Sequence, residues 1–277
     1  MREQPHFLVV IPAHDAEAYI LETLASVQAQ TYESWNAIVV DDASTDTTAK
    51  IVSDARLKDS RIHLIVLEKN HGRPSVPRNR AIQAAIERDL PFDFVSFLDS
   101  DDLWEPGKLR ADAERFVQDP SLGMVHARHV FHLSGDRREE IDLPEIRGVW
   151  DLAWRNAIYC SSVTIARSVV SDFAPLFDED PLLKAVEDTE LWFRLLSANV
   201  RCASVEGRNT VYRLRDSSIS RVGRIEALRR LVYLYAKAAM KNPRIPLATF
   251  YLPLAYRVAM HLGGYLVYSP FESGKKP

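Results

Sequence analysis

Short apolar runs alternate with amphipathic segments through the first 120 residues, and this alternation restricts the fold more than any other sequence feature. Residues 7–11 form such a run, and residues 17–30 follow with apolar side chains at helical spacing. The order recurs, with further strands expected at 37–40, 62–67 and 94–98. Repeated strand and helix signals of this kind predict βα units, so we expect an α/β fold with a mostly parallel sheet flanked by helices.

The pattern changes after Met124 to mixed strands and turns, with Ser134, Gly135 and Asp136 as a hairpin turn. This second half is expected to line the other side of a cleft, with a helix over 188–198 and strands at 201–205 and 210–214. From Arg224 onward the chain is expected to be helical, with Pro243 and Pro246 as breaks and Pro253 as a third candidate.

The net charge of −3 hides two opposite parts. Residues 217–277 hold ten Lys and Arg against two Glu, whereas the preceding 216 residues hold 25 basic and 36 acidic residues. An acidic body disfavours general nucleic-acid binding, because phosphate contacts need a basic face. The two cysteines show no CxxC or Cys/His pattern, and no apolar run is long enough for a signal peptide or a membrane span. A cytoplasmic location follows as an expectation.

Acidic and histidine side chains follow three of the expected strands. Residues 12–15 read PAHD, residues 41–42 are DD, and residues 99–102 read DSDD. Because ligands bind at the carboxyl ends of strands in open α/β sheets, this cluster predicts a divalent metal or a donor-rich ligand. The alternative interpretation is that each acid caps a helix or shapes a turn, which suits a single Asp better than three strand ends together. Neither a G-x-G-x-x-G nor a G-x-x-x-x-G-K-[ST] motif is present, which disfavours dehydrogenases and P-loop NTPases.

Four motifs in order resemble glycosyltransferase family 2, whose members have the GT-A fold. They are a strand-end proline in FLVVIPAHD, the paired Asp in VVDDAST, the DxDD signature in FLDSDDLW, and the ED pair in VEDTELW. The resemblance covers roughly residues 6–220. It implies a GT-A, Rossmann-like catalytic domain over 1–220, with a nucleotide-sugar half at about 1–120 and an acceptor half at about 121–220. Residues 221–277 remain as a basic helical C-terminal extension.

The resemblance also implies roles for the residues that match these motifs. Asp188 corresponds to the general base, and Asp101 to the ligand of Mg²⁺ or Mn²⁺. The expected donor and substrate contacts are Pro12, Ala13, Asp15 and Asp41 for the nucleobase and ribose, Asp99 for the ribose, and Glu187 of the ED pair. Arg78, in the further matching segment PRNRAIQAA, is expected to contact the diphosphate. Trp104 either walls the sugar or acceptor site or packs in the core. Arg215 either binds the diphosphate or is a solvated loop charge.

The implied activity is inverting transfer of a sugar from a nucleotide-sugar donor, expected to be UDP-linked, to a carbohydrate or lipid-linked acceptor. Synthesis of cell-surface polysaccharide or glycolipid is the expected setting. Two alternatives are a degenerate family member that binds nucleotide without turnover, and a sugar-phosphate nucleotidyltransferase. The second normally has a Gly-rich basic N-terminal loop, which PAHDAEAYI lacks. Many family members have Tyr or Phe and then Asn where this chain has His14 and Asp15, so the base contacts are expected to differ.

Two further features allow competing interpretations. The basic segment from Arg221 to Arg244 and the aromatic residues after it form either a membrane-surface element or a helical cap on the catalytic body. His126, His129 and His132 suggest a metal cluster, but strand geometry directs His129 to the opposite face from the other two, which disfavours a shared metal.

Overall fold

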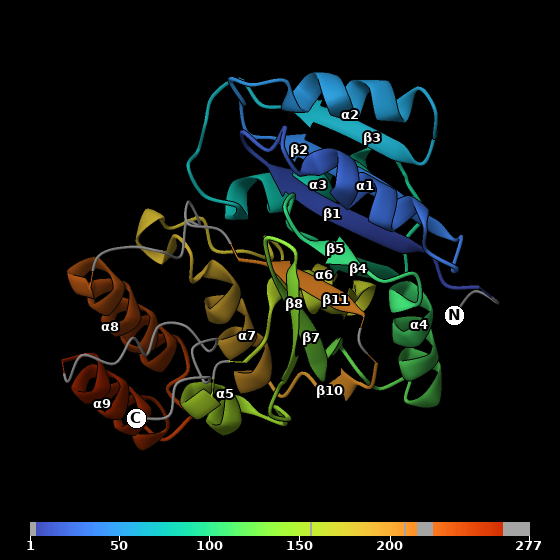
Figure 1. The fold of residues 1–277 in the computed structure, drawn as a ribbon. Helices are drawn as coiled ribbons and strands as arrows, with labels where there is room; N and C mark the ends of the chain where they lie inside the picture. Colours follow the sequence, from blue (N-terminus) through green and yellow to red (C-terminus); the bar gives the residue numbers. More distant parts are fainter. Residues whose placement is uncertain (1–3, 156, 208, 215–223, 263–277) are drawn as a thin grey trace.

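In the computed structural model, which describes residues 4–155, 157–207, 209–214 and 224–262, a seven-stranded sheet lies between helices (Figure 1). The strand order is β10-β6-β9-β4-β1-β2-β3, and β1 to β4 run parallel while β9 is antiparallel to its neighbours. The strands are β1 (Phe7–Ala13), β2 (Trp35–Asp41), β3 (Ile62–Val66), β4 (Phe94–Phe97), β6 (Met124–Ala127), β9 (Thr164–Ala166) and β10 (Cys202–Val205). The expected α/β fold with a mostly parallel sheet is confirmed.

Each face of this sheet is covered by helices because β1 and β2 are apolar on both sides. Along β1, Phe7 and Val9 pack into one core, whereas Leu8 and Val10 pack into the other, and all four side chains are fully buried. The first core includes residues of α1 (Ile20–Gln28), α2 (Thr48–Arg56) and α4 (Lys108–Gln118). The second includes residues of α3 (Ser75–Glu87), α5 (Val149–Arg155), α6 (Arg167–Asp172) and α7 (Glu187–Ser197).

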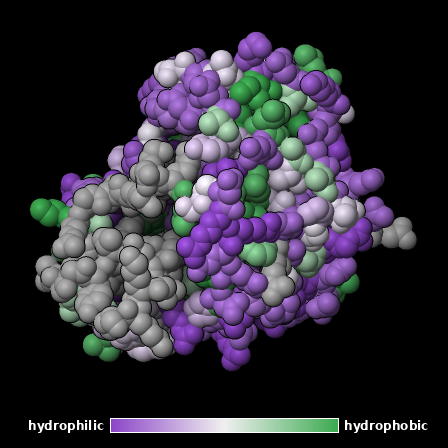
Figure 2. Space-filling model, viewed as in Figure 1, coloured by the Kyte–Doolittle hydropathy of each residue, from purple (hydrophilic) through white to green (hydrophobic). Residues whose placement is uncertain are grey.

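A second sheet of four strands lies beside the first, in the order β5-β11-β7-β8. Its strands are β5 (Leu103–Trp104), β7 (His129–Ser134), β8 (Arg137–Asp142) and β11 (Thr210–Arg213). The predicted turn joins β7 to β8, and Gly135 takes the positive φ of 56° that such a turn favours in glycine. The edge strand β8 is charged and exposed, and Figure 2 shows a hydrophilic band at its position, a composition that discourages edge-to-edge pairing.

The C-terminal residues form two helices, α8 (Arg224–Lys241) and α9 (Ala248–Leu262), that pack against each other and against the second core. Pro243 and Pro246 separate them, as expected. Pro253, however, lies inside α9 and does not end it. The buried side chains of Phe250 and Leu254 on either side of this proline join the core, and this burial compensates the backbone hydrogen bond that proline cannot donate. None of the helices among the described residues has the length and apolar character needed to cross a bilayer.

Two short 3₁₀ helices complete the described fold: η1 (Cys160–Ser162) precedes β9, and η2 (Pro181–Leu183) precedes α7.

A buried ion pair fixes α4 to the sheet. Lys108 Nζ lies 2.6 Å from Asp112 Oδ2 and 2.8 Å from Thr164 Oγ1 in β9, and Lys108 is only 2% exposed. Its ammonium also lies over the ring of Trp104, 4.4 Å from the centroid. Removing one partner of a buried pair leaves the other charge uncompensated.

We therefore expect Asp112→Ala to lower the free energy of unfolding by about 3–5 kcal/mol, measured by urea denaturation. The matched control is Asp54→Ala, which breaks another Lys–Asp pair four residues apart, because that pair is exposed on α2. Exposed pairs contribute only about 0.2–1 kcal/mol. Equal effects of the two substitutions would contradict the structural role of the buried pair.

Candidate active site

The carboxyl ends of three parallel strands meet at one edge of the main sheet. Ala13 at the end of β1 is in register with Asp41 at the end of β2, and Val10 of β1 is in register with Phe97 at the end of β4. The last residues of these strands and the loops that follow carry PAHD, DD and DSDD. The predicted gathering of these three segments at one edge is confirmed by the strand order.

The loops after β1 and β2 are tied together through Asp15 and Asp41. Asp15 has a positive φ of 45°, and its carboxylate accepts the backbone N–H of Thr45 at 2.7 Å. Asp41 is buried and accepts the backbone N–H of Ser44 at 3.1 Å, while the Ser44 hydroxyl accepts the N–H of Asp15 at 3.0 Å. Pro12 and Ala13 are buried within β1. The four residues predicted to hold the nucleobase and ribose therefore lie on adjacent segments.

Asp42, the second acid of the DD pair, has a different environment. It is buried, and its carboxylate accepts the backbone N–H of His71 at 2.9 Å and that of Gly72 at 3.2 Å. The ring Nδ1 of His71 lies 2.8 Å from the same carboxylate. Asp42 thus anchors the loop before α3, which is a structural use of an acid from the strand-end cluster.

Arg78 of α3 lies at the centre of the candidate site and is only 2% exposed. Its Nη2 donates to Asp99 Oδ1 at 2.6 Å, and its Nη1 donates to Glu187 Oε1 at 2.9 Å. The guanidinium also lies 5.1 Å from the ring centroid of Phe177. One cation therefore joins the end of β4 to the first turn of α7. The sequence predicted a diphosphate contact for Arg78, whereas its described contacts are to two carboxylates inside the protein.

Asp188 follows Glu187 in the first turn of α7 and shares this environment. Burial, and then the negative charge of Glu187, raise the pKa of the Asp188 carboxyl to about 7. Arg78 and the backbone N–H of Thr189, at 2.6 Å, act in the opposite direction. A carboxyl group with this pKa is ionised in about half of the molecules near neutral pH, which suits a general base.

The turn after β4 brings three carboxylates together. Asp102 is buried, accepts the Ser161 hydroxyl at 2.5 Å and accepts the backbone N–H of Arg213 at 2.9 Å. Burial, and then the charges of Asp101 and Asp99, raise the pKa of Asp102 well above its usual range. Oxygen ligands that repel one another in this way match a hard divalent cation, which relieves the repulsion. The acidic surroundings of Asp101 therefore fit its predicted role as the metal ligand, while the ribose contact expected of Asp99 stays a prediction.

Two residues that sequence reasoning missed organise this turn. Ser161 of η1 donates to Asp102, and its hydroxyl accepts the N–H of Asp99 at 3.1 Å. Arg213 of β11 donates from Nε to the carbonyl of Asp101 at 2.9 Å and from Nη2 to Glu22 at 2.7 Å. No motif marks Ser161. Arg213 could have been found from the sequence, because it lies in the strand expected at 210–214, two residues before Arg215. Arg215 itself lies outside the described residues.

Trp104 is 3% exposed, and its indole N–H donates to the carbonyl of Ser161 at 2.7 Å. Of its two sequence-based interpretations, this burial favours packing.

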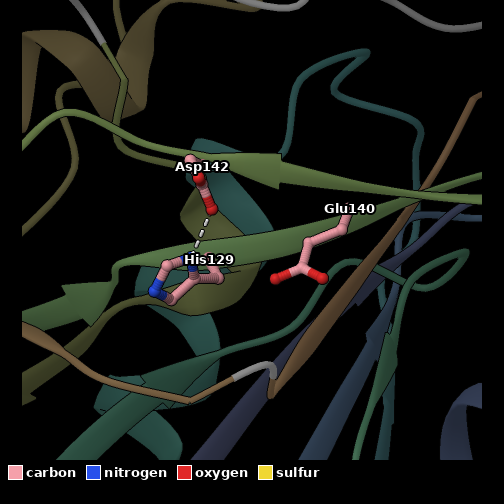
Figure 3. A group of neighbouring side chains, drawn as sticks. All are labelled: His129, Glu140 and Asp142. Carbon is pink, nitrogen blue, oxygen red and sulfur yellow. Dashed lines mark hydrogen bonds and ion pairs between the residues drawn. The ribbon is translucent and has the colours of Figure 1, made fainter.

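The three histidines of the suspected metal cluster each contact different groups. His126 is buried with Nδ1 at the carbonyl of Ala127, and His132 lies 2.6 Å from the Tyr159 hydroxyl. His129 instead joins Glu140 and Asp142 of β8 in a group with metal-ligand spacing (Figure 3). Both ring nitrogens of His129 already contact carboxylates, Asp142 at 2.6 Å and Glu206 at 3.2 Å. This exposed group is accounted for by ion pairing and belongs to the second sheet, not to the strand ends.

Surface hollows occur away from this site as well. One of about 570 Å³ lies at the amino ends of β1 and β2, where Pro5, Tyr32 and Arg110 line it, and another of about 600 Å³ is lined by Pro175, Phe177 and Lys241. Neither includes the strand-end carboxylates, so the chemistry of the side chains and not the size of a cavity identifies the candidate site.

Comparison with known proteins identifies the family. Residues 8–164, more than half of the chain, match Glycosyl transferase family 2. The glycosyltransferase TuaG of Bacillus subtilis (strain 168), named for teichuronic acid biosynthesis, is 30% identical, with 78% of this chain and 82% of that protein covered. The Escherichia coli protein named UDP-Glc:alpha-D-GlcNAc-diphosphoundecaprenol beta-1,3-glucosyltransferase WfgD is 28% identical, with 76% and 78% covered.

The fold is also similar to a solved structure. S. aureus TarS 1-349 in complex with UDP-GlcNAc superposes with a TM-score of 0.70 at 21% identity, covering 94% of this chain and 73% of that chain. At this level of identity the likeness concerns the fold, which is the GT-A arrangement expected from the motifs. The family match over residues 8–164, the 30% identical relative and the shared fold together show that this chain belongs to glycosyltransferase family 2.

Proposed function

We propose that this protein is a metal-dependent, inverting glycosyltransferase that moves a sugar from a UDP-sugar to a hydroxyl of a carbohydrate or lipid-linked acceptor. The observation that carries the proposal is the ion-pair connection of Arg78, which holds Asp99 of the DxDD turn and Glu187, the neighbour of Asp188, around one guanidinium. It keeps the carboxylates assigned to the donor and to the base in one cluster.

The names of relatives support the donor and the setting. WfgD is named for UDP-Glc and a diphosphoundecaprenol acceptor, TarS was solved with UDP-GlcNAc, and TuaG is named for teichuronic acid biosynthesis. We therefore propose a role in cell-surface polysaccharide or glycolipid synthesis. Residues 1–120 would supply the donor half, residues 121–220 the acceptor half and residues 221–277 the extension.

The proposed reaction needs one base. The Asp188 carboxylate accepts the proton of the acceptor hydroxyl while that oxygen attacks the anomeric carbon. The bond from this carbon to the diphosphate oxygen breaks, its electron pair leaves with the diphosphate, and the anomeric configuration inverts. Asp101 would hold a divalent cation, expected to be Mg²⁺ or Mn²⁺, which would supply positive charge to the leaving diphosphate.

Replacing the base tests the proposal directly. We expect Asp188→Asn to lower kcat by about 10²–10⁴-fold, because general-base help is lost, while UDP binding stays unchanged. The matched control is Asp151→Asn, which removes the acid from the first turn of α5 and leaves the strand ends untouched. Near wild-type transfer by Asp188→Asn would rule out the assigned base.

The pKa of Asp188 predicts a pH dependence. Because only the ionised carboxyl accepts the proton, kcat/KM for the acceptor is expected to fall as pH drops below about 7. The charge of Glu187 contributes to the raised pKa of Asp188, so in Glu187→Gln the fall of kcat/KM should move to lower pH. If kcat/KM of Glu187→Gln fell at the same pH as that of the wild type, the electrostatic coupling of the two acids would be contradicted.

Metal and donor binding are measured by thermal stabilisation, since a ligand that binds only the folded protein raises the melting temperature. We expect UDP with Mn²⁺ to stabilise the protein more than GDP or dTDP, and Asp101→Ala to lose the Mn²⁺-dependent part. Glu140→Ala is the control, because it removes a carboxylate from the His129 group alone. If Glu140→Ala lost the Mn²⁺-dependent stabilisation and Asp101→Ala kept it, the metal would bind at the His129 group and the proposal would be wrong.

A further inference from the structure

Exposed apolar side chains are concentrated on the two C-terminal helices and the segment between them. Among the described residues, fourteen large apolar side chains are exposed, and seven of them lie between residues 224 and 262. These seven are Ile225, Val232, Met240, Leu247, Tyr251, Leu252 and Tyr256. The exposed face of a helix in a globular protein usually carries charged or polar residues, so this concentration needs a partner.

The apolar residues of α9 form a stripe at helical spacing. Leu252 and Tyr256 stand four residues apart and are 55% and 51% exposed, and Tyr251 beside them is 47% exposed. Ala255 and Ala259, also exposed, continue the same face. The one arginine of α9, Arg257, is buried and donates to the carbonyl of Trp154 at 3.1 Å, so its charge does not reach this face.

Aromatic rings of α5 extend the stripe. Tyr256 lies 5.7 Å from Trp154 between ring centroids, and Trp154 lies 5.9 Å from Trp150, which is 47% exposed. Tryptophan and tyrosine are the side chains that favour the interface between lipid and water, where an apolar ring meets a polar group. We call the surface of Trp150, Tyr251, Leu252 and Tyr256 the α5–α9 face.

The charge around the α5–α9 face has one sign on the side of α9. Residues 227–262 contain no Asp or Glu. Arg155 at the end of α5 and Arg244 before α9 are exposed, and no ion pair joins either to a described residue. The nearby Asp151 of α5 is half-buried and accepts the backbone N–H of Arg147 at 3.0 Å. Exposed arginines at the ends of the helices that carry an apolar aromatic surface complement an anionic lipid surface.

The two lysines of α8 do not take part in this pattern, because they pair with acids of the catalytic body. Lys237 Nζ lies 2.9 Å from Asp178 and 2.8 Å from Asp180, and Lys241 Nζ lies 2.8 Å from Asp178 and 3.1 Å from Glu190. These lysines fix α8 to the catalytic body as a cap. The aromatic part of the outward surface therefore belongs to α9 and α5, whereas lysines of the basic helix that the sequence singled out attach it to the body.

We propose that the α5–α9 face docks this protein on an anionic lipid bilayer. The inference rests on the proposed function for its purpose, because a lipid-linked acceptor is reached at such a surface. Helix α5 packs against both α9 and α7, and α7 carries Asp188 in its first turn (Figure 1). Docking through α5 and α9 therefore places the membrane one helix away from the element that holds the proposed base.

The test is flotation of the full chain with vesicles of equimolar phosphatidylcholine and phosphatidylglycerol at low salt. We expect the wild type to bind these vesicles more tightly than pure phosphatidylcholine, and Leu252→Gln/Tyr256→Gln to bind at least about tenfold more weakly. The matched control is Leu57→Gln/Val117→Gln, which removes two exposed apolar side chains, 80% and 61% exposed, directly after α2 and within α4. The control is expected to bind as the wild type does.

Three results would overturn the proposal: a wild type that ignores the anionic vesicles, equal weakening by the two double variants, or a dimer that Leu252→Gln/Tyr256→Gln dissociates without any vesicle binding by the wild type. The last would assign the face to a second copy. Stabilisation by UDP and Mn²⁺, measured on the same variants, reports on the folded donor site. Its retention together with lost vesicle binding separates failure of docking from failure of the proposed function.

Discussion

The candidate site depends on the buried guanidinium of Arg78. Arg78 comes from α3, and two segments distant from it in sequence, the turn after β4 and the start of α7, each place a carboxylate against it. Without a cation here, Asp99, Glu187 and Asp188 would repel one another in a poorly solvated space. Arg78 therefore allows acids to gather where the parallel strands end, and leaves Asp188 with its pKa near 7 because the compensation is incomplete.

Local sequence patterns predicted the strands β1 to β4, β10 and β11 and most helices, because apolar runs and helical spacing leave a direct trace in residue order. They also predicted which acids stand at strand ends, since each follows an apolar run. The partners of these acids left no such trace. Arg78 and Glu187 are 109 residues apart, and Ser161 contacts Asp102 across 59 residues without a motif. Tertiary packing decided such contacts, as it decided that α9 continues through Pro253.

The opposite charges of the body and the tail also acquire a physical meaning. Part of the tail's positive charge neutralises acids of the catalytic body, with Lys237 and Lys241 bound to Asp178, Asp180 and Glu190. A basic composition there indicates attachment of α8 to its own domain. The surface of α9 differs because its only arginine turns inward, which the order of residues could not reveal. Charge counted along the chain and charge presented at the surface are thus separate quantities.

The contacts of Ser161 limit which segments can be exchanged between related glycosyltransferases. Its hydroxyl bridges the N–H of Asp99 and the carboxyl of Asp102, and its carbonyl receives the indole of Trp104, so one residue of η1 sets the shape of the whole DxDD turn. The conformation of the turn therefore depends on η1, although Trp104 and Ser161 are 57 residues apart in the sequence. A chimera that imports a foreign turn to change donor preference must import the matching segment 160–162 with it.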